Sequence, residues 1–219
     1  TMLGKVVSEQ DNIEIVKFDL GNLADRVSIK QPLALGAGRK RVVLIDCGCK
    51  QSIIRELIKR DTQLLIVPWN YDFLNDDFDG LLISNGPGDP KHCNQTINYL
   101  KAALKMEKPV LGICLGNQLL ALAAGADTYK LKYGHRSQNQ PAYEVGSRRC
   151  YITSQNHGYA VDASTLSTDW EVWFVNSNDH TNEGIKHKKL PFFGVQFHPE
   201  SSPGPTDTEF IFDLFCKLL

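Results

Sequence analysis

The sequence lacks the features that mark membrane, secreted and nucleic-acid-binding proteins. No apolar run approaches the roughly 20 residues that span a bilayer, and the first residues do not form a signal peptide. An excess of charge of one sign is also lacking, because 24 basic residues nearly balance 25 acidic ones and leave a net charge of −1. No strong electrostatic field therefore draws the protein to nucleic acid or anionic lipid. The abrupt start at Thr1 predicts a piece of a longer protein.

The cysteines lack the spacing of a disulfide framework, and no Cys-x-x-Cys pair occurs because a single residue separates Cys47 from Cys49. The sequence therefore predicts a reducing, cytoplasmic setting and no metal-ligand cluster. A nucleotide phosphate loop is missing too, since no stretch has the G-x-x-x-x-G-K-[ST] spacing. We accordingly expect neither a metal nor a cofactor. The six cysteines are Cys47, Cys49, Cys93, Cys114, Cys150 and Cys216.

Apolar strand-like runs alternate with helix-length segments from Arg41 onward. Strands separated by helices indicate a parallel sheet with helices on both faces. In such sheets the reactive groups gather at the carboxyl ends of the strands. The strand-like runs cover residues 42–46, 64–67, 80–84 and 110–113, and the helical segments cover residues 51–60 and 95–107.

The two ends of the sequence differ from this central pattern. Residues 1–40 are polar and irregular, which predicts a linker or the remnant of a preceding N-terminal domain. Beyond about residue 126 short strand-like pieces are broken by Gly, Asn and Pro, and the chain ends with a strand at 192–197 and a helix at 208–218. We therefore predict one α/β domain over residues 41–219, doubly wound and mostly parallel, with extra antiparallel strands in its second half.

The sharpest local pattern is the strand, turn and helix around Cys114. Gly112 and Gly116 flank this cysteine at the spacing of the G-x-S-x-G nucleophile elbow. Small neighbours are a steric requirement of the turn, and the positive end of the following helix favours a thiolate. The amide of Leu115 is placed to form half of an oxyanion hole, and Gln118 lies one helical turn on, within reach of a substrate. The alternative is that Cys114 is a small buried hydrophobic residue, as most free cysteines are.

A cysteine nucleophile needs an imidazole to take up and return its proton. His198 follows the strand-like run 192–197, and Glu200 projects to the same side of an extended chain, where it can fix the imidazole tautomer. The alternative for His198 is a surface histidine beside a solvated glutamate. His157 is the rival base, and it ranks lower because no carboxylate follows two residues later. The other histidines are expected to be solvated: His92, His135, His180 and His187.

A glycine-rich loop, residues 84–90, follows the strand-like run 80–84 directly. Gly86 and Gly88 allow backbone N–H groups to approach a ligand closely, and either N–H could complete the oxyanion hole. The alternative is an ordinary turn at the end of a strand.

Together, the cysteine elbow and the C-terminal His-x-Glu pair resemble the triad-type (class I) glutamine amidotransferases, which release ammonia from glutamine. Within that family the sequence, from about residue 41 to its end, is most similar to the glutaminase part of carbamoyl phosphate synthetase. Asn117 stands where the family usually has His, and residues 135–138 depart from an Asn-Arg-Gly-His stretch; neither change touches the triad. The similar blocks are 84–90, 112–118, 130–141, 153–159, 182–185 and 195–200.

The resemblance implies a flavodoxin-like fold, a catalytic triad of Cys114, His198 and Glu200, and a pocket for L-glutamine. It also implies that the ammonia passes to a carbamoyl phosphate synthetase domain or subunit, with no role for nucleic acid or membrane. By position, the substrate-binding residues that it implies are Gly86, Gly88, Leu115, Gln118, Asn156, Gly158 and Tyr159.

Two other functions stay open at this point. One is the glutaminase of another biosynthetic enzyme, for guanine nucleotides, cytidine nucleotides or anthranilate, and the block at residues 130–141 argues against it. The other is a catalytically weak or silent regulatory domain that binds the synthetase. Asn117 keeps that reading open, whereas the presence of Cys114, His198 and Glu200 opposes it.

Overall fold

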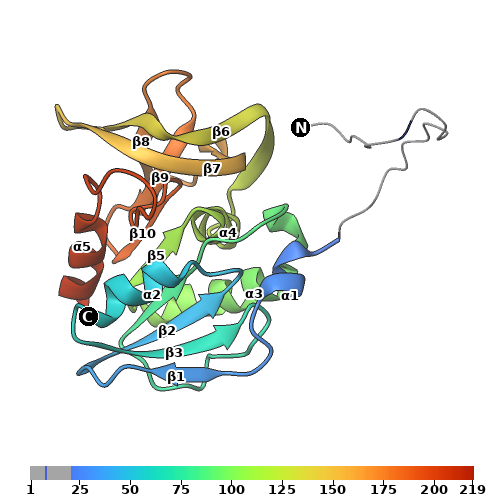
Figure 1. The fold of residues 1–219 in the computed structure, drawn as a ribbon, viewed down its shortest axis with the longest axis vertical. Helices are drawn as coiled ribbons and strands as arrows, with labels where there is room; N and C mark the ends of the chain where they lie inside the picture. Colours follow the sequence, from blue (N-terminus) through green and yellow to red (C-terminus); the bar gives the residue numbers. More distant parts are fainter. Residues whose placement is uncertain (1–7, 9–20) are drawn as a thin grey trace.

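The computed structural model describes residue 8 and residues 21–219, and in this part of the chain ten strands form a single sheet (Figure 1). The strand order is β1-β3-β2-β4-β5-β10-β9-β8-β6-β7. The central neighbours β3, β2, β4, β5 and β10 run parallel, and every other pairing is antiparallel. The strands are β1 (Leu33–Leu35), β2 (Lys40–Asp46), β3 (Thr62–Pro68), β4 (Gly80–Ile83), β5 (Val110–Ile113), β6 (Asp127–Glu144), β7 (Cys150–Asp162), β8 (Trp170–Asn176), β9 (Asn182–His187) and β10 (Phe192–Val195).

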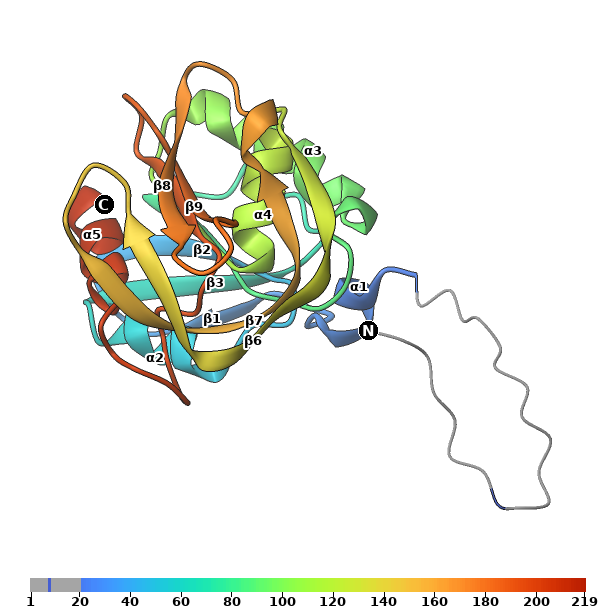
Figure 2. The same cartoon turned by 90° about the horizontal axis from the view of Figure 1, so that it is seen from above.

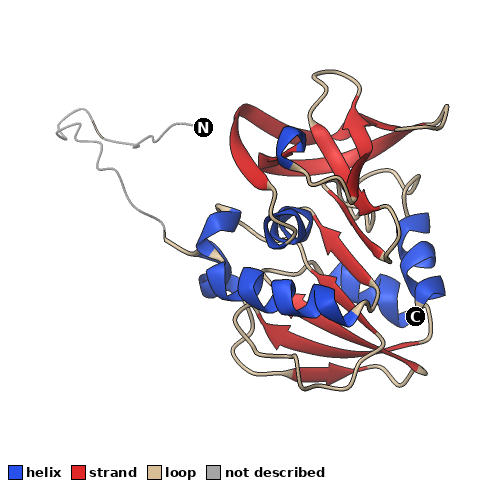
Figure 3. Cartoon of the chain, turned by 180° about the vertical axis from the view of Figure 1, so that it is seen from behind, coloured by secondary structure: helices blue, strands red, loops and turns tan. Residues whose placement is uncertain are grey.

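Helices cover both faces of the parallel strands because successive side chains of each strand point to opposite faces. Val42 and Leu44 of β2 pack into one apolar layer with α2 and α5, whereas Val43 and Ile45 pack into another with α3 and α4. Figure 1 shows α2 and α5 in front of the sheet, and Figure 3 shows the opposite side from behind. The predicted doubly wound, mostly parallel α/β fold is therefore confirmed. The helices are α1 (Leu23–Val27), α2 (Gln51–Ile58), α3 (Asn94–Ala103), α4 (Leu115–Ala123) and α5 (Phe210–Leu218), with short 3-10 helices at Pro90–His92, Leu104–Met106 and Ala163–Thr165.

The helices are also informative about membranes. None of them, in the part of the chain that the structure describes, has the length and apolar character needed to cross a bilayer.

The antiparallel half differs from the short pieces that the sequence predicted. Its strands β6 and β7 pair as one long curved ribbon, from Asp127 opposite Asp162 to Tyr143 opposite Cys150 (Figure 2). Two register shifts interrupt the ladder, and Gly134, at φ +70°, lies within the first of them. Because bulges absorb the irregular residues, glycine and proline bend this ribbon without ending it.

The structure also differs from the irregular character predicted for residues 1–40. Residues 1–7 and 9–20 lie outside the described residues, but α1 and β1 lie before residue 41, and β1 pairs with β3 at the edge of the sheet. Asn22 caps α1 by accepting hydrogen bonds from the amides of Ala24 and Asp25. Residues 21–40 thus contribute a short helix and an edge strand of the sheet, while the division of the chain at residue 41 stays a prediction.

Candidate active site

Cys114 lies in a sharp turn between β5 and α4, as its flanking glycines predicted. Its backbone has φ +54° and ψ −103°, a conformation that a non-glycine residue adopts only under strain. A Cβ on Gly116 would lie 2.1 Å from the carbonyl oxygen of Ile83, and one on Gly112 would lie 2.5 Å from that of Gly116. Side chains are therefore excluded at both positions. The Cys114 amide donates to the Val195 carbonyl at 2.8 Å, which ties the turn to β10.

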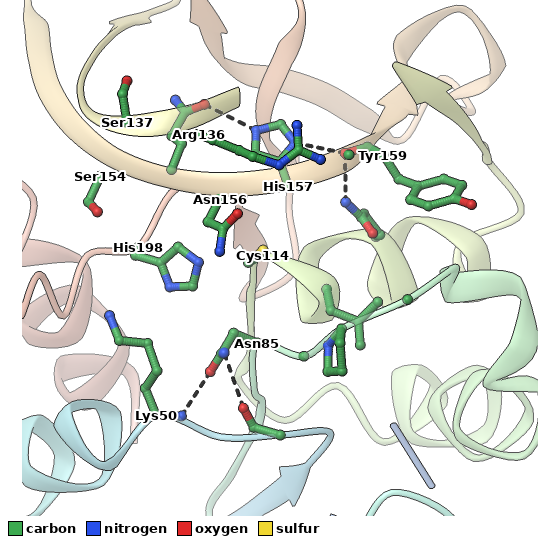
Figure 4. A pocket seen from close by; sticks show the side chains of 18 of the residues that line it. Lys50, Asn85, Cys114, Arg136, Ser137, Ser154, Asn156, His157, Tyr159 and His198 are labelled. Carbon is green, nitrogen blue, oxygen red and sulfur yellow. Dashed lines mark hydrogen bonds between the residues drawn. The ribbon is translucent and has the colours of Figure 1, made fainter. Parts of the chain in front are cut away.

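His198 and Glu200 follow the end of β10 and form a buried pair. The His198 Nδ1 lies 2.6 Å from Glu200 Oε1, and both residues are almost fully buried. Burial lowers the pKa of His198, but the charge of Cys114 and hydrogen bonds with Cys114 and Glu200 outweigh it and raise the pKa to about 10. These contacts therefore favour the protonated form of the imidazole beside the sulfur. Figure 4 shows the Cys114 and His198 side chains directed toward the same pocket.

Lys50, which the sequence analysis did not identify, completes this buried pair. Its Nζ lies 2.9 Å from Glu200 Oε1 and donates to the Ser201 carbonyl at 2.6 Å. Burial raises the pKa of Glu200, yet the contacts with His198 and Lys50 more than offset burial, so the pKa lies below its ordinary value. Lys50 follows the carboxyl end of β2, and that position on a parallel strand is the one signal that could have indicated it.

The glycine-rich loop 84–90 lies against the turn that follows β2. The Ser84 hydroxyl accepts from the Cys47 amide at 2.9 Å, and Asn85 accepts from the Lys50 amide at 3.0 Å. A Cβ on Gly86 would lie 2.2 Å from the Cys47 carbonyl oxygen, so only glycine allows this approach. Gly88, at φ +97°, takes a left-handed conformation. The loop is thereby fixed beside the elbow at the carboxyl edge of the sheet.

A pocket of about 830 Å³ brings the predicted residues together. Cys114, His198 and all seven predicted substrate-binding residues line it, whereas Glu200 lies behind His198 and does not. One side is formed by the loop 84–90 and the start of α4, and the other by β6 and β7. Lining residues that sequence reasoning missed are Gly48, Lys50, Asn85, Pro87, Arg136, Ser137, Gln138, Ser154, Gln155 and Pro203.

The rival base, His157, also lines this pocket but has a different environment. Burial lowers its pKa to about 3, and its Nδ1 lies 2.8 Å from the Tyr159 carbonyl oxygen. Glu183 Oε1 lies 3.9 Å from its Nε2, too far for a hydrogen bond. A histidine held neutral in this way lacks the close carboxylate partner that His198 has. The geometry accordingly favours His198 as the base.

The prediction that the remaining histidines are solvated is wrong for His135. His135 is only 9% exposed, because the bend in β6 directs its ring between Asp179 and Glu183. Its ligand atom and those of His157 and Glu183 lie within 4.8 Å of one another. The sequence predicted no cluster of metal-ligand side chains, whereas the structure brings these three together. Sequence spacing gave no signal, since the three residues come from different strands.

Two of the other cysteines, Cys47 and Cys93, are buried in environments that oppose ionisation. Burial raises the pKa of Cys47, and burial raises that of Cys93 to about 12. All six cysteines, each within the described residues, are free thiols. Cys114 is the only one of them that lines the pocket.

Comparison with known proteins gives concordant matches. The family model described as glutamine amidotransferase class-I matches residues 43–218. The chain is 50% identical to the multifunctional protein CAD of Squalus acanthias over 99% of its own length and 10% of that protein. It is 51% identical to the carbamoyl phosphate synthase arginine-specific small chain of Debaryomyces hansenii over 90% of its own length and 48% of that chain.

A solved structure matches the fold as well. A glutamine amidotransferase from Thermotoga maritima superimposes with a TM-score of 0.62 at 20% identity, covering 75% of this chain and 77% of the other. At this identity the match concerns the fold alone. Among the relatives compared by sequence, the chain spans about a tenth of the length of the multifunctional proteins and about half of the length of the small chain.

Proposed function

The chain belongs to the class I glutamine amidotransferases, and on that basis we propose that it hydrolyses L-glutamine to glutamate and ammonia through a thioester on Cys114. One observation carries the proposal: the strained elbow cysteine and the His198–Glu200 pair line or border a single pocket although they are far apart in the sequence. An arrangement of nucleophile, base and orienting carboxylate is the requirement for acyl transfer at a cysteine.

In the first half of the reaction the Cys114 thiolate attacks the side-chain amide carbon of glutamine. The developing oxyanion is stabilised by the N–H of Leu115, which as the first residue of α4 has no intrahelical acceptor, and by an N–H of Gly86 or Gly88. The protonated His198 gives its proton to the amide nitrogen, the C–N bond breaks, and ammonia leaves. A thioester between glutamine's acyl group and Cys114 remains.

In the second half, neutral His198 takes a proton from water, and the resulting hydroxide attacks the thioester carbon. The C–S bond breaks, glutamate leaves, and Cys114 and His198 return to their charged forms. Glu200 accepts a hydrogen bond from His198 Nδ1 throughout, which keeps Nε2 directed at the reacting atoms. The positive charge of Lys50 compensates the negative charge of the buried Glu200 carboxylate.

We assign glutamine binding to the seven pocket residues that the resemblance indicated. Gln118 has its side-chain amide fixed by bonds to the Tyr159 carbonyl at 2.8 Å and to Gln196 at 3.0 Å, so it joins α4 to β7 across the pocket. Asn156 and Gly158 of β7 line the pocket, and they are more exposed than Gln155 and His157, the buried lining residues with which they alternate. Tyr159 lines the same wall of the pocket, and Gly86, Gly88 and Leu115 line the opposite one.

The proposed acceptor of the ammonia is a carbamoyl phosphate synthetase domain or subunit. Its support is the identity of about half of the residues with the multifunctional protein CAD and with the arginine-specific small chain. We propose a cytoplasmic location on the basis of the six free thiols, which suit a reducing compartment.

The experiment compares Cys114→Ser with Cys150→Ser, which removes an exposed thiol outside the pocket. Glutamate release is measured with and without the synthetase, and a glutamine-like chloroketone is used to label the protein for mass spectrometry. We expect the chloroketone to label Cys114, and we expect Cys114→Ser to abolish glutamate release while ammonia-dependent synthesis persists. Cys150→Ser should behave as the parent protein.

The regulatory alternative predicts the opposite pattern. It requires that the parent protein form no thioester and release no glutamate under either condition. That result would remove the proposed hydrolysis. Equal loss of glutamine-dependent and ammonia-dependent synthesis in Cys114→Ser would contradict the assignment of Cys114 as nucleophile.

A further inference from the structure

A second group of chemically active side chains lies at the β6–β7 wall of the pocket, and two of its members, Gln155 and His157, also line the pocket. His135 comes from β6, Gln155 and His157 from β7, and Glu183 from β9. Each is at most 9% exposed. The His135 Nδ1 lies 2.9 Å from Gln155 Oε1 and 3.0 Å from Glu183 Oε1, and the His157 Nε2 lies 3.1 Å from Gln155 Oε1 and 3.9 Å from Glu183 Oε1. Two nitrogens and two oxygens therefore converge on one buried point.

A neutral His157 cannot donate a hydrogen bond from both of its ring nitrogens. Both ring nitrogens of His157 face acceptor oxygens, Tyr159 O at 2.8 Å and Gln155 Oε1 at 3.1 Å. A neutral imidazole carries one proton, so one of these two nitrogens then faces an oxygen with no hydrogen between them. The side-chain amide of Gln155 is held against a 180° flip, because its Nε2 donates to Thr153 Oγ1. The Thr153 hydroxyl in turn donates to the Gln140 carbonyl.

Glu183 adds a buried carboxyl to the group. Its side chain has no exposed surface, and among the described residues its Oε2 has no hydrogen-bond partner. Its Oε1 accepts from Asn176 Nδ2 at 3.2 Å. A carboxylate in such a place requires a positive counter-charge.

The outer contacts of the two histidines are those of metal ligands. His135 Nε2 lies 2.8 Å from Asp179 Oδ2, which leaves Nδ1 free to coordinate when Nε2 carries the proton. His157 Nδ1 can likewise donate to the Tyr159 carbonyl and leave Nε2 free. Ligating histidines typically donate their second N–H to a carboxylate or a backbone carbonyl in this way.

We propose that His135 Nδ1, His157 Nε2, Glu183 Oε1 and Gln155 Oε1 bind one divalent transition-metal ion, most suitably Zn²⁺. Zinc-ligand distances of about 2.0–2.2 Å in a tetrahedron require neighbouring ligand atoms about 3.3–3.6 Å apart. Four of the six separations are those given above, which run from 2.9 to 3.9 Å and bracket that range, and the nitrogens of His135 and His157 lie within 4.8 Å of each other. An ion at this point turns the unmatched His157 nitrogen into a ligand and neutralises Glu183.

Four protein ligands leave no position open for a substrate, so the ion is structural. It links β6, β7 and β9, and it fixes His157 between the pocket residues Asn156 and Gly158. The competing occupant is a proton on His135 Nδ1, which would lie in the 3.0 Å contact with Glu183 Oε1. The test has to separate an ion from that proton.

Metal binding is measured on the full chain in a Cys114→Ser, Cys150→Ser background, because a pocket or surface thiolate would also bind zinc. After dialysis against chelator, zinc is titrated calorimetrically and its content is determined after gel filtration. We expect one equivalent bound, and at least about 100-fold weaker binding in Glu183→Gln and His135→Asn. Asp179→Asn should weaken binding about 10–100-fold through loss of the outer contact. The exposed His92→Asn serves as the matched control and should bind as the background protein does.

Cobalt(II) provides a readout that needs no ligand variant and therefore does not depend on whether the variants fold. A tetrahedral nitrogen and oxygen site gives strong visible absorption without a thiolate charge-transfer band. Substoichiometric zinc, a weak octahedral cobalt spectrum, or equal binding by background, Glu183→Gln and His135→Asn would each mean an adventitious ion only and would overturn the proposal. The measurement does not involve glutamine hydrolysis, so its failure leaves the proposed function untouched.

Discussion

Gly116→Ala tests the steric requirement of the nucleophile elbow most directly. An alanine Cβ at this position would lie 2.1 Å from the Ile83 carbonyl oxygen and 2.7 Å from its carbon. Both atoms belong to the backbone of β4, a buried central strand, and cannot rotate away. The start of α4 must therefore move away from β4, taking Cys114 and the Leu115 amide with it.

The size of the displacement sets the expected effect. Restoring an ordinary 3.4 Å contact requires a shift of about 1.3 Å, and a misplacement of about 1 Å can cost about 100-fold in rate. We expect kcat/KM for glutamine hydrolysis to fall about 100-fold or more, with a loss of about 1–3 kcal/mol in the free energy of unfolding. Glutamate release gives the rate, and urea unfolding followed by circular dichroism gives the stability.

Gly125→Ala is the matched control at the other end of the same helix. Gly125 has φ +90°, so alanine is strained there by about 1–2 kcal/mol, but no atom lies within 4 Å of the new Cβ. It should lose comparable stability and keep kcat/KM within about threefold of the parent, since nothing moves the pocket. A Gly116→Ala protein with parental kcat/KM, or a Gly125→Ala protein as impaired as Gly116→Ala, would refute the steric reasoning.

Three further predictions concern the residues behind the nucleophile. His198→Ala should lower kcat at least about tenfold more than Glu200→Ala, because an orienting carboxylate is less essential than the base; the reverse order in single-turnover assays would exchange their roles. The alkaline fall of kcat/KM should lie near pH 10, where His198 loses its proton. Because the contact with Glu200 helps to raise the pKa of His198, the fall should move to lower pH in Glu200→Gln. An unmoved pH profile would contradict a contribution of Glu200 to that pKa. Lys50→Met should cost about 1–2 kcal/mol, discounted for the partial exposure of Lys50, because it leaves the buried Glu200 carboxylate uncompensated; unchanged thermal unfolding would show that the ion pair contributes nothing.

The elbow could be predicted from the sequence because its constraints are local. Gly112 and Gly116 are needed because neighbouring backbone atoms lie too close to leave room for a Cβ. The strand before the turn and the helix after it fix the direction of the turn. The alternation of apolar runs and helices likewise predicts the parallel sheet, because each strand is buried on both faces. The periodicity of apolar residues and the need for glycine at the elbow both depend on residues that are close in sequence, so they can be read from the sequence directly.

Contacts between distant strands could not be predicted in the same way. His135 lies in a polar stretch of sequence, but the register shift between Lys130 and His135 places its ring between Asp179 and Glu183. The long β6–β7 ribbon escaped prediction for the same reason, since its bulges hide the alternation of side chains. Lys50 was missed because a lysine at the start of a helix is ordinarily solvated, and only the fold brings Glu200 to it.

The parallel strands and the antiparallel ribbon contribute differently to the site. Four adjacent strands, β2, β4, β5 and β10, each place a pocket residue just beyond the carboxyl end: Lys50, the loop 84–90, Cys114 and His198. These residues include the proposed nucleophile and its charged neighbours, and their positions follow from strand order alone. The β6–β7 wall instead presents residues from the middle of strands, where position depends on register. Substitutions on that wall should therefore change KM for glutamine more than kcat, whereas substitutions at the strand ends should change kcat.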